Sequence, residues 1–159
     1  MNPNQTVVII PFSDELKDAI KTLNEEWLVR YFKIEPKDEQ VLSNPQKYII
    51  DPGGMIFYAQ YNGRIVGTVS LIKINETEFE LSKMAVPDGV QGLGIGKKLL
   101  DHCVQVANEQ QIKKLILYSN RKLTPAIHLY EKYGFVEVPL EDSVYERADI
   151  KMERIIDEL

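Results

Sequence analysis

The sequence predicts one α/β domain over residues 1–159, in which a mixed sheet is covered by helices on both faces. A chain of 159 residues suits a single domain with a real hydrophobic core. Its 44% hydrophobic and 27% charged residues are typical of a globular protein. Apolar runs of strand length alternate with helical spacing in the order β, α, α, β, β, β, α, β, α, β, and this order predicts the mixed sheet.

The N-terminal part of the chain is expected to hold one strand and two helices. Residues 7–12 (VVIIPF) form a short apolar run that indicates a strand. Ser13 is then expected to cap a helix. The apolar positions of this helix recur at helical spacing, at Leu16, Ile20, Leu23, Trp27, Leu28 and Tyr31. A polar stretch follows, and residues 38–42 indicate a second short helix.

The middle of the chain indicates a hairpin followed by a third strand. Residues 55–74 form two strands joined at Asn62 and Gly63, because both residues tolerate the positive φ of a tight turn. A strand over residues 79–86 ends before Pro87.

The C-terminal half is expected to alternate helices and strands. A glycine-rich segment leads into a helix with Leu99, Leu100, Val104 and Ala107 on its apolar side. Residues 113–119 (KKLILYS) indicate a buried strand. Residues 124–135 indicate a helix closed by Gly134, and residues 145–155 a final alternating strand.

Composition excludes several classes of function. The net charge of −5 gives no basic excess that would attract nucleic acid. The single cysteine, Cys103, rules out an internal disulfide and a zinc site built on several cysteines. No basic residue precedes the first apolar run, and no apolar stretch is long enough to span a membrane. We therefore expect a cytoplasmic protein without a nucleic-acid or membrane partner.

The segment 91–100 (QGLGIGKKLL) places three glycines between an apolar strand and a helix. It is not a P-loop, because no Ser or Thr follows Gly96 and Lys97. It also lacks the third glycine of the dinucleotide fingerprint, whose place a lysine takes. What remains is a loop from Gln91 through Gly94 to Gly96, whose backbone N–H groups and helix start can face a pyrophosphate. A glycine-rich turn without a ligand is the alternative.

Residues 80–103 (ELSKMAVPDGVQGLGIGKKLLDHC) closely resemble the central motif of the GNAT superfamily of N-acetyltransferases, and residues 120–135 (NRKLTPAIHLYEKYGF) resemble its second motif. The resemblance implies a central mixed, mostly antiparallel, twisted sheet of about six to seven strands with about four helices on both faces. It also implies acetyl-CoA as co-substrate, and no metal.

The resemblance assigns the contacts to CoA position by position. In the family, the loop that binds the pyrophosphate corresponds to Gln91, Gly92, Leu93, Gly94, Ile95 and Gly96. The strand that offers backbone groups to the pantetheine arm corresponds to Met84, Ala85 and Val86.

Three further polar residues are weaker candidates. Lys97 can meet phosphate oxygens, although lysines in a first helical turn usually stay solvated, as we expect for Lys98. Asn120 can bond the CoA arm or the acceptor. Many relatives carry this asparagine closer to the Ala-Ile-x-Leu-Tyr segment, where this chain has Leu123 and Thr124.

The chemistry needs a base for the attacking amine and a proton for the leaving thiolate. Tyr130 matches the family tyrosine that lies near the CoA sulfur, and a core aromatic is the alternative role. Glu80 lies where several family members place a general base. A base is needed because an amine near neutral pH is mostly protonated. The alternative role of Glu80 is that of an ordinary strand carboxylate. Glu78, two residues away on the same strand face, is the rival candidate for the base.

Other conspicuous side chains fit packing. Trp27, Tyr31 and Phe32 can line the acceptor pocket or pack in the core. His102 and His128 lie on different helices without a nearby carboxylate pattern, so we assign neither a role. Cys103 is expected to pack, since direct transfer needs no acyl-enzyme.

These features together predict an N-acetyltransferase that moves the acetyl group of acetyl-CoA to a primary amine of a small molecule such as a polyamine, amino acid or aminoglycoside. The acidic net charge favours a cationic acceptor. A peptide amine acetyltransferase and a non-catalytic acyl-CoA sensor are the alternatives. Many family members dimerise, so a homodimer is one of the expected partners.

Overall fold

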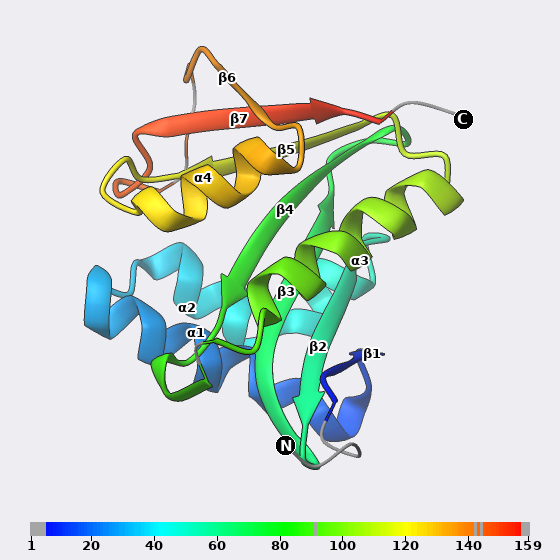
Figure 1. The fold of residues 1–159 in the computed structure, drawn as a ribbon, viewed down its shortest axis with the longest axis vertical. Coiled ribbons are helices and arrows are strands. Elements are labelled where there is room, and N and C mark those ends of the chain that lie inside the picture. The colour runs from blue at the N-terminus through cyan, green and yellow to red at the C-terminus, as the bar shows by residue number, and fades with distance from the viewer. Residues whose placement is uncertain (1–5, 91, 142, 144, 157–159) are drawn as a thin grey trace.

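The computed structural model describes residues 6–90, 92–141, 143 and 145–156. Its strands are β1 (Val8–Pro11), β2 (Met55–Tyr61), β3 (Arg64–Lys73), β4 (Glu78–Ala85), β5 (Lys114–Ser119), β6 (Val136–Val138) and β7 (Ile150–Ile155) (Figure 1). Its α-helices are α1 (Lys17–Tyr31), α2 (Pro36–Ser43), α3 (Ile95–Glu109) and α4 (Thr124–Lys132). Shorter turns are η1 (Asp14–Leu16) and η3 (Asp88–Val90), both 3-10, and the π-helical η2 (Gln46–Ile50).

The strands form one sheet in the order β1-β2-β3-β4-β5-β7-β6. Neighbouring strands are antiparallel except β4 and β5, which are parallel. Helix α3 makes the crossover that parallel neighbours require. The predicted mixed, mostly antiparallel sheet with helices on both faces is confirmed.

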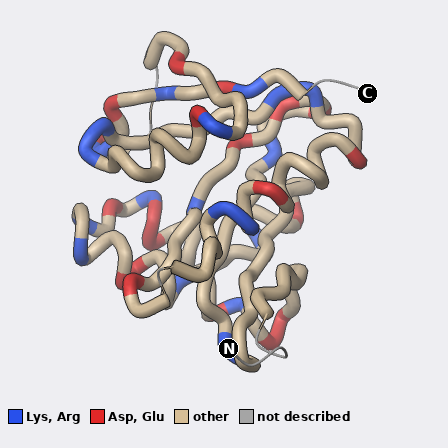
Figure 2. The backbone as a smooth tube through the Cα atoms, viewed as in Figure 1, with Lys and Arg blue, Asp and Glu red and all other residues tan. Residues whose placement is uncertain are grey.

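Helices pack on both faces of the sheet and build two cores. Helices α3 and α4 cover one face, where Leu99, Leu100 and Tyr130 join one cluster of buried side chains. Helices α1 and α2 cover the other face, where Ile20 and Leu42 join the second cluster. Basic and acidic residues are scattered along the chain and separated by longer uncharged stretches (Figure 2). Among the described residues, no helix combines the length and the apolar character that a membrane crossing requires.

Strand β4 is irregular at the centre of the sheet. Thr68 pairs with Ala85 and Ser70 with Ser82, so two residues of β4 oppose one residue of β3. Lys83 lies in this bulge with a φ of 54°, which is rare for a residue with a side chain. Because a bulge redirects a side chain, Lys83 reaches the face covered by α1 and α2, and Ala85 returns to the α3 core.

The hairpin prediction is confirmed, since Asn62 and Gly63 have φ of 55° and 75°. Ser13 is the N-cap residue of η1, which runs directly into α1, but its side chain makes no cap hydrogen bond. The final strand begins at Ile150 instead of residue 145. Residues 145–149 leave the ladder, because the backbone N–H groups of this segment bond to a side chain of another element. Strand β6 and η2 were not predicted.

Candidate active site

A central cavity opens where β4 and β5 separate. The two strands pair only over Glu78–Glu80 with residues 114–116. Beyond that point the ends of both strands, α1, α4 and the segment before β7 enclose a cavity of about 230 Å³. The lining side chains important for its chemistry are Glu80, Lys83, Asn120, Tyr130, Tyr145 and Arg147.

The glycine loop lies at the start of α3. Gly92 and Gly94 have φ of 91° and 68°, a conformation that favours glycine. A Cβ atom on either residue would meet nothing within 4 Å, so the space beside the loop is open. Ile95 is buried in the core and fixes the helix start, whose first N–H groups have no partner inside the helix. This arrangement suits an anion such as a pyrophosphate. The expected role of Gln91 lies outside the described residues.

The other predicted contacts of the loop fall on accessible positions. Lys97 and Lys98 are exposed in the first turn of α3, and Leu93 and Gly96 are half-buried. Met84 on β4 and Val86, directly after the strand, line the cavity, whereas the side chain of Ala85 is buried in the core. Beyond Glu80 this edge of β4 has no ladder partner on β5, so its backbone groups can bond an extended ligand.

Tyr130 lies in the cavity wall, on the last turn of α4. Its ring packs edge-on against Phe135, with 6.1 Å between ring centroids. Burial raises the pKa of the Tyr130 phenol to about 12, so the phenol keeps its proton near neutral pH. This side chain is available as a hydrogen-bond or proton donor to a group bound in the cavity.

Glu80 and Glu78 have different surroundings. Glu80 lines the cavity, and burial raises the pKa of its carboxyl, although the Ser82 hydroxyl and the Lys83 charge partly oppose the shift. Glu78 lies outside the lining, where its carboxylate accepts hydrogen bonds or ion pairs from Lys114 (3.1 Å) and Asn75 (3.3 Å). The geometry therefore favours Glu80 over Glu78 as a base.

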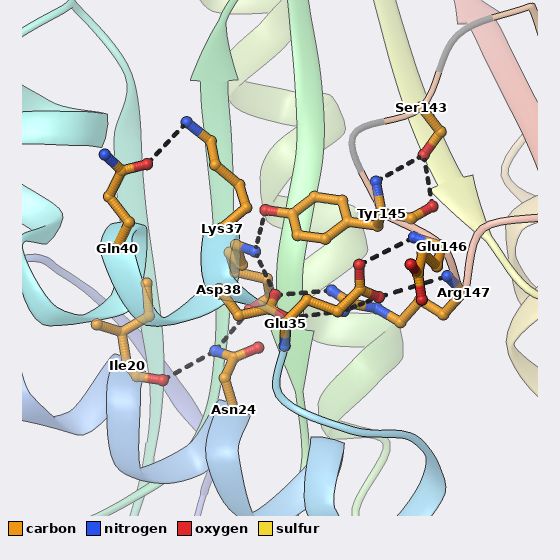
Figure 3. A network of polar contacts seen from close by, with 11 residues as sticks. Ile20, Asn24, Glu35, Lys37, Asp38, Gln40, Ser143, Tyr145, Glu146 and Arg147 are labelled. Carbon is orange, nitrogen blue, oxygen red and sulfur yellow. Dashed lines mark hydrogen bonds and ion pairs between the residues drawn. The ribbon is translucent and has the colours of Figure 1, made fainter.

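A buried polar network, which the sequence did not predict, forms one side of the cavity (Figure 3). The Asp38 carboxylate accepts hydrogen bonds from Lys83 Nζ at 3.0 Å and from both terminal nitrogens of Arg147 at 2.7 and 2.8 Å. Glu35 accepts from Arg147 at 3.2 Å. Lys83 Nζ also donates to the Tyr145 hydroxyl at 2.7 Å. The network joins α2, the β4 bulge and the segment before β7.

Asn120 lines the cavity, but both polar atoms of its side chain form hydrogen bonds with the protein backbone. Its amide nitrogen donates to the Arg147 carbonyl at 2.7 Å, and its side-chain oxygen accepts from the Lys122 N–H at 2.9 Å. Asn120 therefore supports the segment that carries Arg147, and a contact to CoA would compete with these bonds.

Trp27 and Tyr31 on α1, and Phe32 just after it, line two neighbouring cavities. Trp27 and Phe32 line the central cavity and also pack against the second core cluster. Trp27 and Tyr31 line a neighbouring cavity of about 160 Å³, where the Tyr31 hydroxyl bonds Asp88 at 3.3 Å.

The remaining conspicuous side chains pack. The ring of His102 lies edge-on to Phe57, with 4.4 Å between centroids. Cys103 is fully buried, and burial raises the pKa of its thiol, which excludes a reactive thiolate. Within the described residues, no cluster of His, Cys, Asp and Glu could hold a metal ion.

Comparison with known proteins gives the family to which this fold and site belong. The model of the acetyltransferase (GNAT) family matches residues 18–135. The chain belongs to this family.

The individual relatives share about a third of their residues or fewer with this chain over the matched parts. An uncharacterized N-acetyltransferase of Mycobacterium tuberculosis is 33% identical over 89 residues, which cover 56% of this chain and 57% of the relative. The match thus spans little more than half the length of that relative. A GNAT acetyltransferase structure from Staphylococcus aureus is 27% identical, with a TM-score of 0.85 over 96% of this chain and all of that one.

A spermidine N-acetyltransferase of Vibrio cholerae, solved with CoA and spermine, is 21% identical with a TM-score of 0.73 over 95% of this chain and 96% of that chain. At this identity the likeness shows the shared fold alone.

Proposed function

We propose that the protein transfers the acetyl group of acetyl-CoA to the primary amine of a small molecule. The observation that carries this proposal is the meeting of Glu80 and Tyr130 in one cavity, at the end of the strand that leads into the glycine loop. The open space and N–H groups at the start of α3 fit a pyrophosphate, and the free edge of β4 fits the pantetheine arm.

The side chains of the cavity divide the proton transfers between them. Acetyl-CoA supplies a thioester, at whose acyl carbon a C–N bond forms to the amine while the C–S bond breaks. Glu80 accepts the proton that the amine loses, directly or through a water molecule. Tyr130 donates its phenolic hydrogen to the departing sulfur and later regains a proton from solvent. No covalent intermediate with the protein is needed, in agreement with the buried thiol of Cys103.

The size of the cavity supports a small acceptor. Its volume of about 230 Å³ must hold both the acetyl end of the donor and the reacting amine. Pockets for whole ligands usually measure about 300–1,000 Å³.

We expect Gly94→Glu to weaken CoA binding by about 100-fold or more, measured by titration calorimetry. The new carboxylate would repel the pyrophosphate, and a side chain at a φ of 68° would strain the helix start. Gly63→Glu is the matched control, because Gly63 has a φ of 75° and lies on the hairpin. Unchanged CoA affinity in a folded Gly94→Glu variant would show that the pyrophosphate binds elsewhere.

We expect the pH profile of kcat/KM to fall on the acidic side as Glu80 gains a proton. Because burial raises the Glu80 pKa, this fall should be centred above the ordinary value of 4.5. Glu80→Gln should lower kcat/KM by about 100-fold and remove the part of the acidic fall that belongs to Glu80, leaving the fall caused by protonation of the acceptor amine itself. Glu78→Gln removes a carboxylate outside the cavity and should keep both the rate and the profile. An acidic fall of unchanged shape and midpoint in a folded Glu80→Gln variant would exclude Glu80 as the base.

A further inference from the structure

Asn24 is a buried polar residue in the wall of the central cavity. It lies in the middle of α1, is 4% exposed, and lines the same cavity as Glu80 and Tyr130. Its side-chain nitrogen Nδ2 donates two hydrogen bonds, to the Ile20 carbonyl at 2.9 Å and to the Lys83 carbonyl at 3.2 Å. Because these bonds use both hydrogens of the amide nitrogen, they also fix the position of the amide oxygen Oδ1.

The oxygen of this amide is an unused hydrogen-bond acceptor. Within the part of the chain that the structure describes, no N–H or O–H group donates to Asn24 Oδ1. Ser70 Oγ is the only side-chain polar atom of those residues that is both fully buried and unpartnered, so Asn24 Oδ1 keeps some accessible surface. Asn24 lines the central cavity, and Figure 3 shows its nitrogen turned toward Ile20 and its oxygen on the opposite side of the amide. The cavity wall therefore holds a fixed acceptor oxygen.

The stability of the fold accounts for the nitrogen of Asn24 but not for its oxygen. The bond from Nδ2 ties α1 to the bulge of β4, where Lys83 has no partner in the β3 ladder. The oxygen adds nothing to this tie, and asparagine is a poorer helix former than leucine or alanine. A largely buried polar atom without a partner costs free energy, which a ligand that supplies the partner would offset.

An amine that attacks a thioester can use such an oxygen. A neutral primary amine has one lone pair, which must point to the acyl carbon, and two N–H groups, which need acceptors. The carboxylate of Glu80 is one acceptor in the cavity, and Asn24 Oδ1 is a second. The side-chain oxygens of Asn120 and Tyr145, which line the cavity as well, already accept hydrogen bonds within the protein.

We propose that Asn24 binds the acceptor amine: its Oδ1 accepts one N–H of the amine, while Glu80 accepts the other, directly or through a water molecule. This inference rests on the proposed acetyl transfer. With both hydrogens bonded, the lone pair of the nitrogen is directed to the thioester. A secondary amine has a single N–H and leaves one of the two oxygens unpaired, so the pair of oxygens selects primary amines over secondary amines.

The first test compares primary amines with their N-methyl derivatives in the wild-type protein. The primary amines are phenethylamine, isopentylamine, putrescine and L-alanine, and for putrescine both nitrogens of the derivative are methylated. The measurement is acetyl-CoA-dependent release of thiol, with the acetylated product identified by mass. For the best primary acceptor we expect kcat/KM to be about tenfold or more higher than for its N-methyl derivative, because one hydrogen bond to a buried oxygen is not made.

Asn24→Leu separates this selection from crowding by the added methyl group. Leucine has a similar volume but no oxygen, so kcat/KM for the primary amine should fall by about tenfold and that for the N-methyl derivative should change little. The ratio between the two should fall toward one, while the KM for acetyl-CoA stays unchanged. General damage to the fold would lower both rates together and leave the ratio as it is.

Asn108→Leu is the matched control for this variant. The side-chain nitrogen of Asn108 also donates to a carbonyl four residues earlier, that of Val104 at 3.2 Å, but Asn108 lies on α3 outside the cavity. This substitution should leave the ratio at the wild-type value. A thermal melt checks that both variants fold. A folded Asn24→Leu variant with the wild-type ratio would overturn the role of Asn24.

The outcomes also separate this inference from the proposed function. If N-methyl derivatives are acetylated as fast as their primary amines, acetyl transfer stands and the inference is overturned, even if Asn24→Leu does not fold. If no amine of either kind is acetylated, the proposed function fails, and the inference fails with it.

Discussion

Tyr130→Phe should lower kcat by about 100-fold, the loss expected when one proton or hydrogen-bond donor to the leaving group is removed. The ring would remain in place against Phe135, and only the hydroxyl in the cavity would be lost. CoA affinity should change little, because the pyrophosphate loop and the β4 edge are untouched. The measurements are steady-state kinetics with acetyl-CoA and calorimetry with CoA.

Tyr58→Phe provides the matched control for this substitution. Tyr58 is also a buried tyrosine whose pKa burial raises to about 12, but its hydroxyl donates to the Leu16 carbonyl in the core under α1. Its loss should cost about 1 kcal/mol of stability and leave kcat near the wild-type value. A Tyr130→Phe variant as fast as the wild type would exclude Tyr130 as the donor to sulfur.

Asp38→Asn should reduce the free energy of unfolding by about 3–5 kcal/mol near neutral pH, because the buried Lys83 and the half-buried Arg147 would lose their shared counter-ion. Asp38 is fully buried and bonds both Lys83 and Arg147. Burial by itself raises the pKa of Asp38, but the hydrogen bonds from Arg147 and the charge of Lys83 outweigh it and lower the pKa below 3.8. Urea unfolding of both proteins measures the difference.

The pH dependence of this difference follows from the lowered pKa. A carboxyl whose folded pKa is depressed stabilises the protein above its unfolded pKa, and this contribution is lost as the pH falls through the folded pKa. The gap between wild type and Asp38→Asn should therefore be full above about pH 5 and narrow below pH 4. Asp14→Asn, at an exposed ion pair with Lys17, should change stability by less than about 0.5 kcal/mol. Equal effects of the two substitutions would contradict the buried network.

Elements with a local signal were predictable from the sequence. The Asn62-Gly63 turn and the apolar spacing of α3 depend on neighbouring residues, and both are present in the structure. The predicted final strand began at residue 145 because apolar and polar side chains alternate there. In the structure this alternation over residues 145–149 has another cause. There, Tyr145 and Arg147 point to partners in the network, and the backbone of the segment bonds to Glu35.

The candidate site was predictable to the extent that it lies within the two motifs. Residues 80–103 and 120–135 supplied Glu80 and Tyr130, and both line one cavity. The network was not predictable, because its partners are 45, 62 and 109 residues apart in the sequence. The only local sign was a lysine at an inward position of an apolar strand, which a bulge brings to the opposite face.

Acetyl-CoA-dependent thiol release, measured with amino acids, diamines, aminoglycosides and short peptides and with product masses determined, is the decisive test of acetyl transfer. At least one small amine should gain one acetyl group for each thiol released, at a rate that falls in Tyr130→Phe. If acetyl-CoA binds but no amine raises thiol release above hydrolysis, the proposed transfer is contradicted, and a non-catalytic acyl-CoA-binding protein becomes the better account.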